Sequence, residues 1–238
     1  MVLSSIVFLI VLAWGFGFSA TFFVKNASNL FERNIMRLGI GIATFLLVGV
    51  LLNLFHILLD WRLFVGLALL GPLVYTLKVR KFPSWPFKSL LVKENIYVLL
   101  ALILFSFSLY MYASGAFSYP YLENDDPWHH AQSVTYVAQE KTLFAPTDYK
   151  FKYLDPYPPG YALLMGILAQ TNDSLSWTLK FGNALILAFA GLFFYFFAKE
   201  FTGHRQQALF STFVLVSLPS FFTHFIWAHT LVVMLAFP

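Results

Sequence analysis

Long apolar stretches alternate with short polar ones along this chain. A helix of about 20 apolar residues crosses the hydrocarbon core of a bilayer. Six stretches approach or exceed that length: residues 2–24, 38–59, 63–77, 96–117, 179–198 and 208–222. A further apolar segment begins at Phe225, and the sequence stops inside it at Pro238. The pattern predicts an all-α, polytopic transmembrane helical bundle of about six to seven spans. We expect an N-terminal portion of a longer protein, and a naturally short product stays open as the alternative.

The longest polar segment, residues 118–159, follows the fourth span. The next stretch, 161–170, is apolar but only about half as long as a span requires. We expect it to form a juxtamembrane helix that lies on the outer surface instead of crossing. These boundaries divide the chain into an N-terminal transmembrane region, 1–95, and a second transmembrane region, 96–238, which carries the loop.

The composition supports a membrane protein. Hydrophobic residues make up 59% of the chain and charged residues 11%, whereas a soluble domain usually carries about 25% charged residues. The chain has no cysteine, which excludes disulfides, thiolate nucleophiles and cysteine-ligated metals. In a soluble protein, a net charge of +4 would indicate binding of nucleic acid. In a membrane protein the basic residues set orientation, so we expect no nucleic-acid partner.

Lysine and arginine residues indicate which polar segments face the cytoplasm. The most basic segment holds Lys78, Arg80, Lys81, Lys88 and Lys93. If this segment is cytoplasmic, alternation of the spans places residues 25–37 and 199–205 there too. The N-terminus and loop 118–159 then lie outside. We therefore predict a multi-pass protein of the cell membrane with an extracytoplasmic loop.

This loop gathers charge that is scarce elsewhere, because six of the 11 acidic residues lie between Glu123 and Gly160. Near its start is the run Asp125-Asp126-Pro127-Trp128-His129-His130. Aspartate followed by proline is typical of a helix start. The run predicts a helix over 127–141, with Asp126 as the N-cap and Trp128 on an apolar face.

The same run is also typical of a catalytic or metal-binding site. Asp126 is three residues before His129 and four before His130, so the three side chains can share one edge of a helix. A carboxylate beside a membrane can act as a general base or a metal ligand, and histidine can tune the base or bind the metal. A cap needs one aspartate, and Asp125 and Asp126 together exceed that need. Capping and chemistry therefore both stay open as interpretations.

A second cluster, Tyr153-Leu154-Asp155-Pro156-Tyr157-Pro158-Pro159-Gly160, ends the loop. Its prolines and glycine are typical of a stiff turn before a helix, but such a turn requires neither Asp155 nor the two tyrosines, Tyr153 and Tyr157. A carboxylate and tyrosine rings would suit a sugar-binding groove. Lys150 and Lys152 are either a solvated face or a site for a lipid phosphate.

In these residues the chain resembles the GT-C superfamily of membrane glycosyltransferases, and oligosaccharyltransferase catalytic subunits in particular. The similar residues are Asp126-Pro127-Trp128-His129-His130, after an outward-going span, and the proline-glycine stretch that begins at Asp155. Lipid-A aminoarabinose transferases and protein O-mannosyltransferases are similar in their acidic pair and Pro-Pro segment. The resemblance covers residues 110–238. It departs from the family where Ala131 replaces the arginine that is typical of oligosaccharyltransferases.

The resemblance implies transfer of a sugar or oligosaccharide, with inversion, from a polyprenyl-phosphate carrier to an acceptor protein or glycolipid at the extracytoplasmic face. Asp126 would activate the acceptor or hold a divalent cation, Mg²⁺ or Mn²⁺, and Asp125 would support it. The residues expected to bind the substrates are Trp128, His129, His130, Asp155, Tyr157, Lys150 and Lys152.

Two other classes stay open. The chain could be a non-catalytic membrane partner, or a transporter or flippase of lipid-linked sugars. A transporter is expected to hold ionisable residues at broken helices near the middle of the bilayer. The predicted spans contain almost none, which favours the enzyme.

Overall fold

The computed structural model describes residues 2–24, 30–80, 95–146, 153–154, 157–218 and 225–238. Within these ranges it contains nine α-helices and no strand, which confirms the predicted all-α class. In chain order the helices are α1 (Val2–Ala20), α2 (Leu30–Leu54), α3 (Trp61–Val79), α4 (Ile96–Phe117), α5 (Asp125–Glu140), α6 (Gly160–Ala169), α7 (Leu175–Thr202), α8 (Arg205–Val216) and α9 (His229–Leu235).

Four of the described helices are long and apolar enough to cross a membrane. They are Phe31–Leu54 within α2, together with α3, α4 and α7 in full. The apolar part of α1, Ser4–Ala20, is shorter. The predicted span 208–222 corresponds to α8, which has 12 residues and ends at Val216, and the last apolar segment forms the seven-residue α9. The predicted number of six to seven spans is therefore not confirmed.

Helix α2 begins well before the predicted start at residue 38 and includes two arginines. Arg33 donates a hydrogen bond to the carbonyl oxygen of Thr21 at 3.0 Å, and Arg37 donates to the Thr21 hydroxyl at 2.9 Å. Both bonds reach across to the end of α1. A buried charge is tolerated when it is hydrogen-bonded, so α2 can extend through residues that hydropathy alone assigns to a loop.

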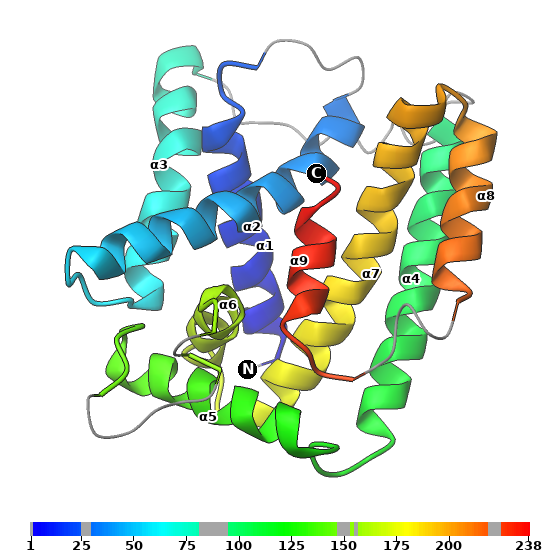
Figure 1. The fold of residues 1–238 in the computed structure, drawn as a ribbon. Coiled ribbons are helices and arrows are strands. Elements are labelled where there is room, and N and C mark those ends of the chain that lie inside the picture. The colour runs from blue at the N-terminus through cyan, green and yellow to red at the C-terminus, as the bar shows by residue number, and fades with distance from the viewer. Residues whose placement is uncertain (1, 25–29, 81–94, 147–152, 155–156, 219–224) are drawn as a thin grey trace.

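The helices form two groups in Figure 1, with α1, α2 and α3 on one side and α4, α7 and α8 on the other. Helix α1 packs against α2 and α3, and α7 packs against α4, α8 and α9. A Cβ atom on Gly41 would lie 1.6 Å from the carbonyl oxygen of Ala13, so the backbones of α2 and α1 touch at this glycine. Small residues at such crossings allow membrane helices to approach closely.

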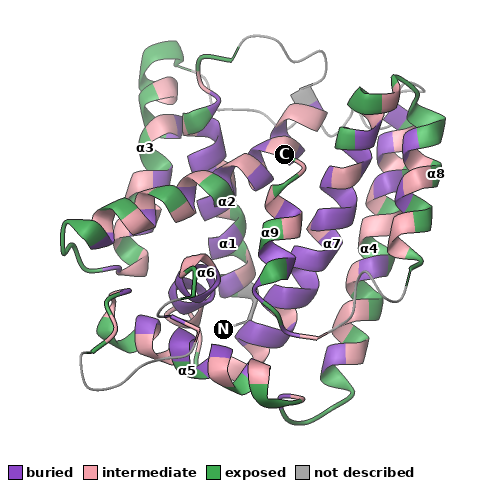
Figure 2. Cartoon of the chain, viewed as in Figure 1, coloured by how far each residue is buried: buried purple, intermediate pink, exposed green. Residues whose placement is uncertain are grey.

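Helix α6 corresponds to the predicted juxtamembrane helix, but its environment differs from the prediction. Every residue from Tyr161 to Leu168 is buried, because α5, α2, α1 and α7 pack around this helix (Figure 2). It is thus enclosed by protein and does not lie exposed on a surface. Its C-terminal Gln170 accepts a hydrogen bond from the backbone N–H of Trp61 at 2.9 Å and donates one to the carbonyl oxygen of Leu59 at 2.8 Å.

Polar contacts tie several turns together at the end of the molecule that carries α5. Lys141, which follows α5, forms an ion pair with Asp60 at 2.5 Å, and the Ser5 hydroxyl donates to the carbonyl oxygen of Thr171 at 3.3 Å. At the other end, Lys199 of α7 pairs with Glu32 of α2 at 2.7 Å. The predicted alternation of the spans stays a prediction. The face of the membrane that each end occupies stays a prediction.

Candidate functional site

The site begins at the first turn of α5. The N-cap is Asn124, whose Oδ1 accepts a hydrogen bond from the backbone N–H of Asp125 at 2.8 Å. Asn124 has φ of 86° and ψ of 172°, a backbone conformation that residues other than glycine rarely adopt. The prediction of Asp126 as the N-cap is therefore wrong. Asp125 and Asp126 lie inside the first turn, where the helix dipole favours negative charge.

Because Asn124 caps the helix, the carboxylate of Asp126 is available for another contact. Its Oδ1 accepts a hydrogen bond from the hydroxyl of Tyr153, which lies beyond the end of α5. This hydrogen bond is the main cause that raises the pKa of Tyr153 to about 12. The tyrosine therefore stays protonated at neutral pH and acts as the donor.

His130 is buried among aromatic rings beside this pair. Its ring stacks on that of Tyr153, with centroids 4.2 Å apart and an interplanar angle of 25°, and lies 4.9 Å from the ring of Tyr161 and 6.3 Å from that of Tyr157. Burial lowers the pKa of His130 to about 4, and the nearby Asp126 carboxylate offsets part of that effect. The imidazole is therefore neutral at physiological pH.

We use the name Asp126 cluster for six side chains: Asp126, His129, His130, Tyr153, Tyr157 and Tyr161. The ring of His129 lies 5.9 Å from that of Tyr153. The Tyr161 hydroxyl is buried and, among the described residues, has no hydrogen-bond partner. The cluster thus combines one carboxylate, one tyrosine donor and two histidines at the end of the molecule where α4 ends.

The structure places the remaining predicted residues differently. Asp125 is exposed on the first turn of α5. Trp128 is 52% exposed, and the buried face of α5 instead contains His130, Val134 and Val137, so the predicted apolar face is rotated. This exposure leaves the Trp128 ring accessible to a ligand. The predicted substrate residues Asp155, Lys150 and Lys152 lie outside the described residues.

Sequence reasoning gave no role to Lys180, the one lysine in the first turns of α7. It is 4% exposed, donates a hydrogen bond to the carbonyl oxygen of Tyr119 and lies 5.6 Å from the ring centroid of Phe117. A small cavity beside it is also lined by Glu123 and Pro127. A single lysine within an otherwise apolar span was the signal that could have indicated it.

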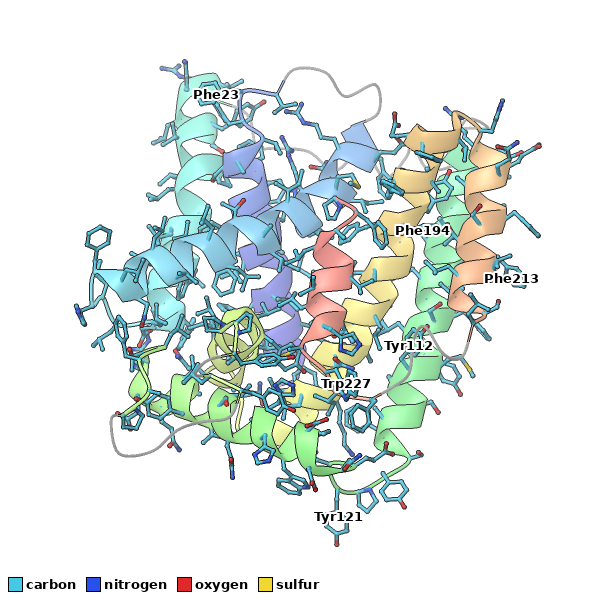
Figure 3. All side chains as sticks on the ribbon, in the orientation of Figure 1. Phe23, Tyr112, Tyr121, Phe194, Phe213 and Trp227 are labelled. Atoms are coloured by element: carbon cyan, nitrogen blue, oxygen red, sulfur yellow. The ribbon has the colours of Figure 1, made fainter. Side chains whose placement is uncertain are left out.

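Residues 225–230, which lead into the first turn of α9, also lie near the site. The ring of His229 lies 4.5 Å from that of Trp227, which is labelled in Figure 3. The charge of His229 would further lower the pKa of His130. Asn183 of α7 holds this segment in place, because its side chain donates to the carbonyl oxygen of Phe225 at 2.9 Å and accepts from the Thr230 hydroxyl at 3.0 Å.

The predicted divalent cation finds no complete site in the described part of the chain. There, no group of three His, Asp or Glu side chains lies in an arrangement that could hold a metal ion. Mg²⁺ usually takes one or two carboxylates together with water and substrate phosphates, and Oδ1 of Asp126 is already occupied by Tyr153. The divalent cation therefore stays a prediction, and we assign no chemical step to one.

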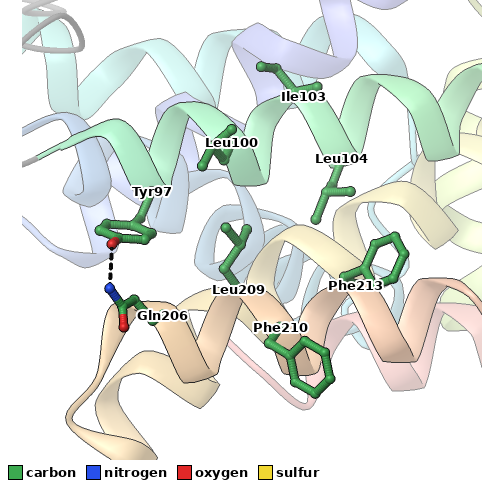
Figure 4. A pocket seen from close by; sticks show the side chains of 8 residues that line it. All are labelled: Tyr97, Leu100, Ile103, Leu104, Gln206, Leu209, Phe210 and Phe213. Carbon is green, nitrogen blue, oxygen red and sulfur yellow. Dashed lines mark hydrogen bonds between the residues drawn. The ribbon is translucent and has the colours of Figure 1, made fainter.

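Two further hollows are apolar. A groove of about 450 Å³ lies between α4 and α8, where Gln206 donates a hydrogen bond to the Tyr97 hydroxyl at 3.0 Å (Figure 4). A larger cleft of about 750 Å³ is lined by residues of α1, α2, α4 and α7. Neither lining includes an acidic, basic or histidine side chain, so the Asp126 cluster is the better candidate for chemistry.

No protein-family model, curated protein or solved structure matches this chain. The class of protein therefore rests on the molecule itself. It is an all-α protein in its described residues, with four helices that could cross a membrane and a carboxylate held by a tyrosine beside a buried histidine. The resemblance to GT-C glycosyltransferases stays a prediction.

Proposed function

We propose that this protein is a membrane glycosyltransferase that moves a sugar or oligosaccharide from a polyprenyl-phosphate carrier to an acceptor protein or glycolipid at the extracytoplasmic face. The observation that carries the proposal is the position of Asp126. Its carboxylate lies in the first turn of α5, held by Tyr153, just beyond the end of the candidate span α4. Tyr153 holds this carboxylate in place. In our proposal it lies at the depth of the lipid head groups, where it can act on a lipid-linked substrate.

Asp126 acts as the general base in this proposal. An oxygen or nitrogen of the acceptor attacks the anomeric carbon of the sugar, and Oδ2 of Asp126 accepts the proton that the acceptor loses. The new bond joins the acceptor to the anomeric carbon. The bond from that carbon to the phosphate oxygen breaks, and its electron pair leaves with the lipid phosphate. Attack from the opposite face inverts the configuration of the sugar.

The exposed aromatic residues suit recognition of the sugar. Tyr157 is 38% exposed at the edge of the Asp126 cluster, and Trp128 projects from the same first turns of α5. Aromatic faces offer apolar contact to a sugar ring, and their polar atoms can bind its hydroxyls. His130 is buried, so its role is to support the neighbouring rings.

The fold gives little support to the alternative that this protein is a transporter. Among the described residues, two buried charged side chains belong to candidate spans, Arg37 in α2 and Lys180 in α7. Both lie within the first turns of their helices, where each bonds to a neighbouring segment. A transporter would instead be expected to hold such residues at helix breaks near the middle of the bilayer.

The test is transfer of labelled sugar out of the lipid fraction by membranes that contain the full chain, with a panel of polyprenyl-phosphate sugars as donors. We expect Asp126→Asn to reduce transfer by ~10²–10⁴-fold, the usual contribution of a general base. Asp173→Asn is the matched control, because Asp173 is an exposed aspartate outside the cluster. Equal transfer by wild type and Asp126→Asn at matched expression would remove the proposed role.

A further inference from the structure

We infer that Tyr153 is the residue that positions Asp126 for proton transfer, through its hydroxyl and through its ring stacked on His130. The inference rests on the proposed function and extends it to a residue that the sequence suggested only as one tyrosine ring of a sugar-binding groove.

The first argument is the hydrogen bond itself. Tyr153 is 27 residues from Asp126 in sequence, so local helix geometry does not bring the two together. Its hydroxyl donates to Oδ1, which restricts rotation of the carboxylate, and within the described part of the chain Oδ2 accepts no hydrogen bond. Hydrogen bonds to an ionised carboxylate are stronger than those between neutral groups, so this contact can hold the side chain in one orientation.

The second argument is that the Tyr153 ring is itself fixed on two sides. His130 stacks on it with centroids 4.2 Å apart, and Tyr157 meets it edge-on at 4.8 Å and 83°. His130 is in turn held between this ring and that of Tyr161 on α6. The orientation of Asp126 is therefore linked to the buried packing of α5 against α6.

The chemical consequence concerns catalysis more than binding. Loss of the tyrosine hydroxyl leaves the carboxylate in place but frees it to rotate away from the acceptor. Misplacement of a reacting group by about 1 Å can reduce a rate by about 10²-fold. A positioning role therefore predicts a lower kcat with little change in KM. A purely structural role predicts lower stability with unchanged kcat.

A double-mutant cycle tests the contact without any assay of transfer. Thermal unfolding of the full chain in detergent would be compared for wild type, Tyr153→Phe, Asp126→Ala and the double variant. We expect Tyr153→Phe to lower the melting temperature of the wild type and to have no further effect beside Asp126→Ala, since groups in contact are not additive. Additive losses would overturn the inference.

Kinetics then tests the role. We expect Tyr153→Phe to lower kcat by ~10–10²-fold with KM nearly unchanged. The matched control is Tyr136→Phe, which removes a tyrosine hydroxyl of α5 that donates to the carbonyl oxygen of Phe144 at 2.6 Å. If wild type and Tyr153→Phe are equally active, the inference is wrong and the proposed function stands. If wild type is inactive, the proposed function is wrong, and the double-mutant cycle still tests whether Tyr153 holds Asp126.

Discussion

His130 is a buried titratable residue, and its protonation makes the stability of the fold depend on pH. It is 3% exposed on the inner face of α5, and the ionisable groups around it are Asp126, His129, His229 and the cluster tyrosines. Burial disfavours its charged form more strongly than the carboxylate favours it, so its pKa falls from 6.5 to about 4. The neutral ring can then stack on Tyr153 without a buried charge.

This shift predicts a loss of stability in acid. Between pH 6.5 and about 4 the unfolded chain binds a proton at His130 that the folded chain does not bind, so stability falls as pH falls through this window. The full effect corresponds to at most about 3 kcal/mol. Melting temperatures between pH 7.5 and 4.5 should fall less steeply for His130→Gln than for wild type. Exposed His204 supplies the control, and His204→Gln should keep the wild-type slope.

At the scale of elements, the contact between α5 and α6 supports the site. Gly166 of α6 faces Val137 of α5, and a Cβ atom on Gly166 would lie 2.7 Å from Cγ1 and 2.9 Å from Cβ of that valine. The same two helices carry His130 and Tyr161. Separation of α5 from α6 should therefore disturb the ring packing beside Asp126.

We predict that Gly166→Ala destabilises the fold by ~1–3 kcal/mol, because the added methyl group overpacks this contact. Gly66 of α3 is a suitable control, since a Cβ atom there would meet no atom within 4 Å. Gly66→Ala should be neutral or stabilise by up to ~1 kcal/mol, as expected for glycine in a helix. Thermal unfolding in detergent compares the two, and equal effects would show that α5 and α6 do not touch at Gly166.

In the whole molecule, polar contacts between turns lie at two opposite ends. One end contains the Asp126 cluster, the Asp60–Lys141 ion pair and the contact between Ser5 and Thr171. The other contains the Glu32–Lys199 ion pair and the ends of α3 and α7 (Figure 1). If the candidate spans cross a membrane, these ends lie on opposite faces.

This arrangement predicts the outcome of cysteine labelling, for which the cysteine-free wild type is an unreactive background. In intact cells a membrane-impermeant maleimide should label Glu140→Cys and Asp173→Cys. It should label Arg80→Cys and Glu200→Cys only after permeabilisation. All four residues are exposed. Reaction of Glu140→Cys and Glu200→Cys from the same side would contradict the separation, and reversed labelling would place the site in the cytoplasm.

The local features could be predicted from the sequence, because helix formation and apolar length depend on neighbouring residues. The sequence predicted α4 with the same bounds as observed, and α6 within a residue at each end. It also indicated that Asp126 and His130 lie on one helix.

The contacts between distant segments follow from the packing of the helices and could not be predicted from hydropathy. Hydropathy does not show that Arg33 and Arg37 find partners on α1, so α2 was predicted too short at its start. It does not show that α6 is enclosed, nor that Tyr153 reaches Asp126. Burial and side-chain hydrogen bonds arise when helices pack together, and residues that are far apart in sequence then share one environment.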